Sequence, residues 1–136
     1  MTCDRYLEQA KINEQAARSI QQSYPDWAVT MCFYAALHLI EHYACIKGFD
    51  IEQYKEQDQE SRHTTRRKYV DDLAVQLRSR NLRIAYTYLE QESRKARYLK
   101  DITTNAKLYY TKHKDKVTES FENLRKIKQL LGTDLS

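Results

Sequence analysis

Apolar side chains recur every three or four residues in five segments of the chain, and this is the spacing of one face of an α-helix. The segments span about 3–22, 25–47, 61–78, 82–100 and 113–131. The second segment is apolar on nearly every side, which predicts a helix at the centre of the protein. We therefore expect an all-α protein, an antiparallel bundle of four to five helices in a single domain over residues 1–136.

The stretches between these segments carry the residues that end or start helices. Pro25 suits the first position of a helix, and Gly48 and Gly132 suit the position after the last one. Residues 49–60 are polar and acidic, which predicts a long, mobile connection, whereas the pattern does not decide whether 101–112 is helical. The inward-facing stripes predict a core that contains Trp27, Leu37, Leu39, Val70, Leu73, Leu77, Leu89, Phe121 and Leu124.

Composition supports a helical protein and places it, by default, in the cytoplasm. Two glycines and one proline in 136 residues are too few for a sheet protein or a loop-rich protein. No uninterrupted apolar run reaches the length of about eighteen residues that a membrane-spanning helix needs. The first residues also lack the order of charge and apolarity that marks a secretion signal. We expect a cytoplasmic protein with no membrane contact.

The three cysteines, Cys3, Cys32 and Cys45, are odd in number and form no CxxC pair. Cys32 and Cys45 lie in the most apolar segment, where a free thiol packs as a small hydrophobic group. We expect all three to be reduced packing residues. His38 and His42, beside Glu41, have a spacing that suits one metal ion, but no third ligand is indicated. No metal and no cofactor are predicted.

The charge of the chain is mildly positive and unevenly distributed. The net charge is +4 at pH 7, and basic residues cluster between positions 62 and 100. This balance permits an acidic partner such as RNA without requiring one. The chain also contains 11 tyrosines, a residue type that often lies half-buried beside a groove or an interface.

Several polar side chains fall where the helical pattern places inward-facing residues. His38 shares a stripe with Trp27, and the apolar stripe of the third segment extends back to Arg66 and His63. Arg97 lies in line with the inward face of the fourth segment. One interpretation is structural: Arg66 and Arg97 each pair with an acid such as Glu41, and His38 is a neutral core histidine. The other is a functional site, because burying several costly groups on converging helices is unusual.

The same blocks resemble the HEPN superfamily of helical domains. The resemblance rests on Trp27 with the run Phe33–His38, on Ser61-Arg62-His63 with Arg66, and on Tyr86, Leu89 and Ser93 leading to Ala96-Arg97-Tyr98. It implies an antiparallel four-helix up-and-down bundle with a short extra helix, in a homodimer. Many HEPN members are metal-independent RNases of defence or toxin–antitoxin systems. Others are non-catalytic and bind nucleotides or a small nucleotidyltransferase.

The RNase members carry an arginine and, with about four to six residues between them, a histidine; no arginine of this chain is followed by a histidine five to seven positions on. Metal-free RNA cleavage still needs a base, an acid and a cation for the developing charge. We therefore hypothesise a substitute catalytic site of His38, His63, Arg66 and Arg97, with Arg62, Arg67, Arg94 and Tyr98 contacting RNA phosphates. The alternative function is a non-catalytic module that dimerises and binds a nucleotidyltransferase or another protein.

Overall fold

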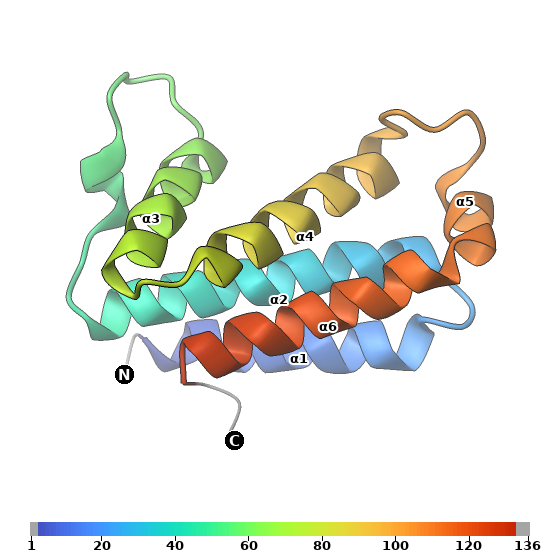
Figure 1. Cartoon of the computed structure of the whole chain (residues 1–136), viewed down its shortest axis with the longest axis horizontal. Coiled ribbons are helices and arrows are strands. Elements are labelled where there is room, and N and C mark those ends of the chain that lie inside the picture. The colour runs from blue at the N-terminus through green and yellow to red at the C-terminus, as the bar shows by residue number, and fades with distance from the viewer. Residues whose placement is uncertain (1–2, 133–136) are drawn as a thin grey trace.

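Six α-helices and one short 3-10 helix form the architecture of the computed structural model, which describes residues 3–132 (Figure 1). No strand occurs within this range, so the prediction of an all-α fold is confirmed. The helices are α1 (Asp4–Ile20), α2 (Pro25–Ile46), η1 (Ile51–Tyr54), α3 (Arg62–Gln76), α4 (Arg80–Tyr98), α5 (Ala106–Lys112) and α6 (Lys114–Leu130).

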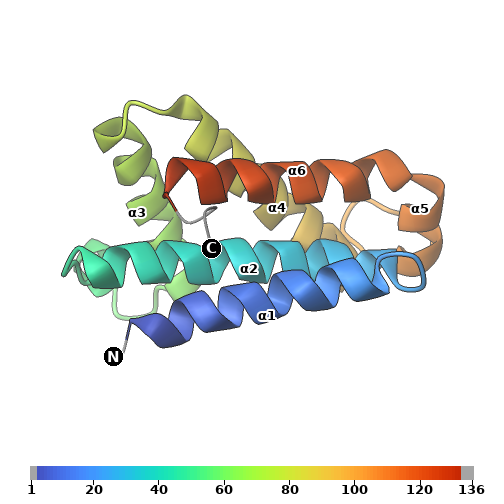
Figure 2. The same cartoon turned by 90° about the horizontal axis from the view of Figure 1, so that it is seen from below.

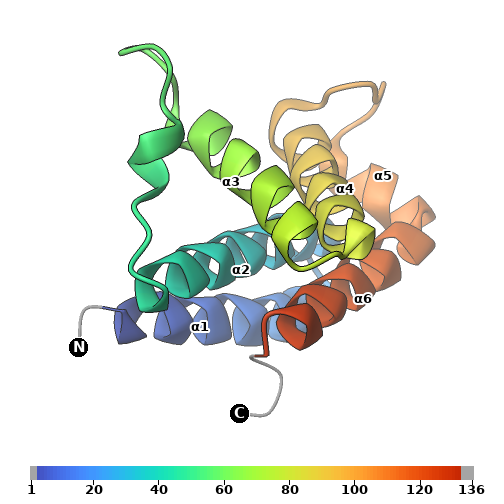
Figure 3. The same ribbon diagram turned by 60° about the vertical axis from the view of Figure 1, so that its left-hand side comes forward.

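Four long helices, α1, α2, α4 and α6, form an antiparallel bundle (Figures 1 and 2). Helices α2 and α6 run opposite to α1 and α4. The apolar α2 contacts α1, α4, α5 and α6, which confirms its predicted central position. Helix α3 lies outside this bundle, packed on η1 and α4 (Figure 3).

The helix ends agree with the predicted boundaries within two residues, and local chemistry explains them. Pro25 is the first residue of α2. The Ser61 hydroxyl caps α3 by accepting a hydrogen bond from the Thr64 backbone N–H at 3.2 Å. In the segment that the pattern left undecided, Asn105 caps α5 by accepting from the Leu108 N–H at 2.8 Å. The predicted connection 49–60 contains the short helix η1.

The predicted core is right for most of its members. Leu37, Leu39, Val70, Leu73, Leu89 and Leu124 are buried, and Phe121 is partly buried against them. Trp27 is 53% exposed and Leu77 is 37% exposed, so these two predictions are wrong. Helix α2 is apolar almost all round, and periodicity therefore cannot show that Trp27 is on its solvent side. Leu77 is the C-terminal cap residue of α3, where the helical face no longer continues.

Helix α2 has the length and mean hydropathy of a membrane-crossing segment, although no uninterrupted apolar run predicts one. In the structure, 67% of its most apolar window is buried by the other helices. The core helix of a bundle meets the same criterion, and the packing of α2 is that of a core helix.

The cysteine prediction is wrong for two of the three residues. Cys3 at the start of α1 and Cys45 near the end of α2 form a disulfide, with their Cα atoms 5.6 Å apart. The Cys3 carbonyl also accepts a hydrogen bond from His42 Nδ1 at 3.1 Å. Only Cys32 is a free, buried thiol. Disulfides persist mainly in oxidising compartments, so the cysteines give no support to the predicted cytoplasmic residence.

Candidate functional site

A polar cleft lies between the beginning of α3 and the C-terminal half of α4. The two helices are joined by a short turn and separate from it toward these ends (Figure 1). The cleft has a volume of about 280 Å³, just below the usual range for small-molecule pockets, about 300–1,000 Å³. Its walls are Ser61, His63, Thr64 and Arg67 from the α3 side, and Glu90, Arg94, Arg97 and Tyr98 from α4.

Helical spacing explains why these side chains share the cleft. His63 and Arg67 are four residues apart on α3, and Glu90, Arg94 and Arg97 follow one another at steps of four and three on α4. Residues three or four apart lie on the same face of a helix. Each helix therefore presents a row of charged or titratable groups to the other, and the cationic groups outnumber the single carboxylate.

Glu41 of α2 fixes the first turns of α3 from behind the cleft. Its carboxylate accepts a hydrogen bond from Arg66 Nε at 2.9 Å and two from Arg62, at 3.0 and 2.7 Å. Glu41 and Arg66 are both 6% exposed. Burial raises the pKa of Glu41, but the hydrogen bonds from Arg62 and the charge of Arg66 outweigh it, so the pKa is lowered. Glu41 is therefore an ionised anchor shared by two guanidinium groups.

Within residues 3–132, Arg97 is held by aromatic side chains and not by an acid. It donates to the Tyr34 hydroxyl at 2.9 Å and to the Ser93 carbonyl at 3.3 Å. Its guanidinium also lies 5.5 Å from the centre of the Tyr34 ring and 4.9 Å from that of Tyr98. Cation–π contacts orient an arginine without neutralising it. The full charge of Arg97 therefore remains available to an anion in the cleft.

The other two arginines of the cleft differ in their surroundings. Arg67 Nε lies 2.8 Å from Glu90 Oε1, an ion pair that joins α3 to α4 without a well-aligned hydrogen bond. Arg94 is exposed and has no hydrogen-bond or ion-pair partner within residues 3–132. Arg94 is thus the cation of the cleft whose charge is least compensated by the protein.

His63 is a neutral hydrogen-bond donor in this setting. Its Nδ1 lies 3.2 Å from Arg66 NH1, and because a guanidinium can only donate, Nδ1 must accept. The proton of the neutral ring is then on Nε2, the nitrogen left for a ligand. Burial, followed by the charges of Arg66, Arg97, Arg67 and Arg94, lowers the pKa of His63 below its ordinary value of 6.5.

We predict that the protein loses stability as the pH falls below 6.5, the ordinary pKa of histidine. The lowered pKa means that the unfolded chain binds a proton at His63 before the folded protein does. The contribution of neutral His63 to the free energy of unfolding is therefore fully present above pH 6.5. It is lost as the pH falls through the pKa of His63 in the folded protein. His38, whose pKa is lowered by burial and then by Arg66, acts in the same direction.

Urea denaturation at a series of pH values measures this effect. His63→Gln should flatten the decline. A His63 pKa at or above 6.5 in an NMR titration of the folded protein would contradict the prediction.

The structure brings five of the eight residues of the hypothesised site into the cleft: His63, Arg67, Arg94, Arg97 and Tyr98. Arg66 lies directly behind it and contacts His63. Two do not reach it. The His38 ring stacks on Tyr6 of α1 with 6.5 Å between ring centres, and Arg62 is bound by Glu41 and Glu52. The structural interpretation is right for Arg66, which pairs with Glu41, but not for Arg97.

Sequence reasoning missed Glu90, Ser61 and Thr64 in the walls of the cleft and Tyr34 beneath Arg97. Glu90 precedes Arg94 by one helical turn, so its place on the same face was readable from the sequence. Tyr34 belongs to a different helix, and its contact with Arg97 depends on how α2 and α4 pack. No group of three or more His, Cys, Asp or Glu side chains is placed to share a metal ion in the described part of the chain.

Comparisons with known proteins do not extend this description. No family model, curated protein or solved structure matches the chain. The resemblance to the HEPN superfamily therefore remains a prediction from the sequence, and the chemistry of the cleft has to be argued from its own residues.

Proposed function

We propose that this protein is a HEPN-like protein that binds single-stranded RNA through its phosphates in the cleft between α3 and α4. The observation that carries the proposal is the grouping of Arg94, Arg97 and Arg67 around one cleft, with Arg94 uncompensated by any described residue. Arginine binds phosphate oxygens with paired N–H donors, which suits it to this task. The Nε2–H of His63 supplies a further donor.

Aromatic side chains beside the arginines support a single strand over a duplex. Tyr98 is 68% exposed and lies under Arg97, so its ring is open to a base. Bases of single strands stack on exposed aromatic rings, and cationic grooves follow the backbone. The preference for RNA over DNA rests on the HEPN resemblance of the blocks at 27–38, 61–66 and 86–98.

Binding is better supported than cleavage. Metal-free cleavage needs one group that accepts a proton and another that donates one. His63 is the histidine that lines the cleft, and its accepting nitrogen is occupied by Arg66. His38, the second histidine of the hypothesised catalytic set, is stacked on Tyr6 instead. We therefore propose no catalytic step.

We predict that Arg94→Gln weakens binding to a short single-stranded RNA about tenfold. Removing one phosphate contact should also reduce the slope of log K against log salt by about 0.7. Fluorescence anisotropy at several salt concentrations measures both quantities. Arg83→Gln is the matched control, because Arg83 is an exposed arginine on the same helix outside the cleft. Equal effects of the two substitutions, or no binding by the unaltered protein, would refute the proposal.

The alternative function, a protein-binding module, has one specific observation in its favour. Three large apolar side chains are exposed near α5: Tyr24 at 50%, Trp27 at 53% and Leu108 at 40%. Lys107 lies 4.9 Å from the centre of the Tyr24 ring, which joins α5 to the loop between α1 and α2 (Figure 2). A homodimer or a nucleotidyltransferase partner would cover this end. Gel filtration at several protein concentrations, with Trp27→Ser as the variant, tests self-association.

A further inference from the structure

An ion pair closes the inner end of the cleft, the end nearest the turn that joins α3 to α4. Arg67 Nε of α3 lies 2.8 Å from Glu90 Oε1 of α4, so the two side chains meet across the space between the helices. His63 and Arg94 each lie four residues, about one helical turn, further from the α3–α4 turn. A strand running along the cleft toward this turn would have to break the Arg67–Glu90 pair. The cleft therefore has one open end for a polymer, at the start of α3 and the end of α4 (Figure 1).

Helix α2 closes the floor of the cleft. The buried ring of Phe33 stacks on His63 with 6.0 Å between the ring centres. The Tyr34 hydroxyl accepts the hydrogen bond from Arg97 at 2.9 Å. The space that remains, about 280 Å³, is just below the usual range for a pocket that holds one small molecule, about 300–1,000 Å³. This space suits a single end group better than a length of strand with nucleotides on both sides.

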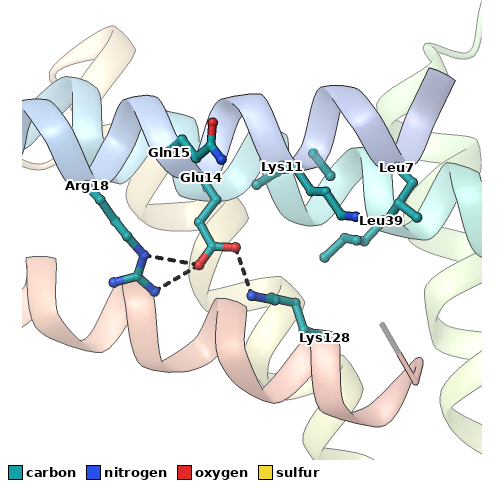
Figure 4. Close-up of a pocket in the computed structure, with 9 residues that line it drawn as sticks. Leu7, Lys11, Glu14, Gln15, Arg18, Leu39 and Lys128 are labelled. Atoms are coloured by element: carbon teal, nitrogen blue, oxygen red, sulfur yellow. Dashed lines mark hydrogen bonds and ion pairs between the residues drawn. The ribbon is translucent and has the colours of Figure 1, made fainter. Parts of the chain in front are cut away.

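Two arginines at the open end of the cleft keep their charge. Arg94 and Arg97 have no ion-pair partner within residues 3–132, whereas the third arginine is matched by the carboxylate of the cleft. A hollow of about 350 Å³ between α1, α2 and α6 shows the opposite case. There Arg18 and Lys128 both donate hydrogen bonds to Glu14, at 2.8 and 3.0 Å, and so join α1 to α6 (Figure 4). The cleft is thus the hollow whose arginines are left for an anion.

We propose that the cleft receives the end of an RNA strand and binds its terminal phosphate monoester. This inference rests on the proposed function, RNA binding in the same cleft. A terminal monoester carries a charge of about −1.5 to −2 at pH 7, which matches Arg94 and Arg97, whereas each internal phosphodiester carries a single charge. The exposed ring of Tyr98 lies beside Arg97, where the terminal base can stack on it. A 5′ and a 3′ phosphate share this chemistry, so the experiment includes both.

Fluorescence anisotropy of the full chain with four forms of one oligouridylate, each carrying a dye on an internal base, tests the proposal. The forms have a 5′ phosphate, a 3′ phosphate, neither phosphate, or ends joined into a circle. At least one phosphorylated form should bind about tenfold more tightly than the unphosphorylated strand and the circle. The circle has as many phosphates as a phosphorylated linear strand, so attraction to the backbone alone would make these two bind equally.

Two variants test whether the cleft is responsible for this preference. Arg94→Gln should reduce the advantage of the terminal phosphate from about tenfold to about twofold. Arg83→Gln should leave the advantage unchanged, because Arg83 lies outside the cleft beside Asp71. The inference is overturned, while RNA binding stands, if the circle and the unphosphorylated strand bind as tightly as the phosphorylated forms or if Arg94→Gln leaves the advantage intact. If no form binds, the proposed function fails and this inference fails with it.

Discussion

Replacing Glu41 by alanine is expected to lower the free energy of unfolding by about 3–5 kcal/mol. The substitution leaves the buried guanidinium of Arg66 without its carboxylate and removes two hydrogen bonds from Arg62. A buried charge that loses its partner keeps the full cost of its desolvation. The loss should appear in urea denaturation as a lower midpoint with an unchanged slope.

A matched acid and a double substitution make this prediction specific. Glu52 also pairs with Arg62 but is exposed, so Glu52→Ala should cost only about 0–1 kcal/mol. Replacing the pair together, as Glu41→Leu with Arg66→Met, should recover most of the stability because no isolated charge remains buried. If Glu41→Ala and Glu52→Ala prove equally mild, the pair is not the structural anchor of α3.

Removing the Cys3–Cys45 disulfide is expected to cost about 2–4 kcal/mol. The bond closes a loop with a sequence separation of 42, and its loss gives the unfolded chain more freedom. The effect should be measurable as a drop in the thermal or urea midpoint of the Cys3→Ser, Cys45→Ser double variant.

A reductant supplies the matched control for the disulfide. Dithiothreitol should destabilise the unaltered protein by a similar amount and leave the double variant unaffected. Cys32 is a buried free thiol whose pKa is raised by burial, and it should not contribute to this response. A midpoint that does not respond to the reductant would mean that the bond is absent in solution or makes no net contribution.

Helix positions could be predicted from the sequence because the apolar period, Pro25 and the capping residues act locally. The two kinds of prediction that were wrong, the burial of some side chains and the state of the cysteines, share one physical cause. The exposure of Trp27 follows from which side of an apolar helix its neighbours leave uncovered, and no local signal records this. The pairing of Cys3 with Cys45 likewise depends on α1 and α2 being antiparallel neighbours.

The candidate site was predictable in part for the same reason. His63 with Arg67, and Arg94 with Arg97, could be grouped because each pair lies on one helix face. Helical spacing could not predict which of these charges are neutralised by an acid and which remain available to a ligand. Whether an arginine is neutralised depends on an acid that is distant in the sequence. Glu41 forms ion pairs with Arg62 and Arg66, whereas Arg94 has no ion-pair partner within residues 3–132.

Two acids, Glu41 on α2 and Glu90 on α4, hold α3 in place by ion pairs, and both are 6% exposed. Shielded pairs of this kind weaken little when salt is added, whereas contacts between arginine and phosphate in water weaken strongly. If the cleft binds RNA as proposed, a rise in ionic strength should therefore release the RNA while the walls of the cleft keep their positions. On the proposed function, the recognition surface then stays formed between one binding event and the next.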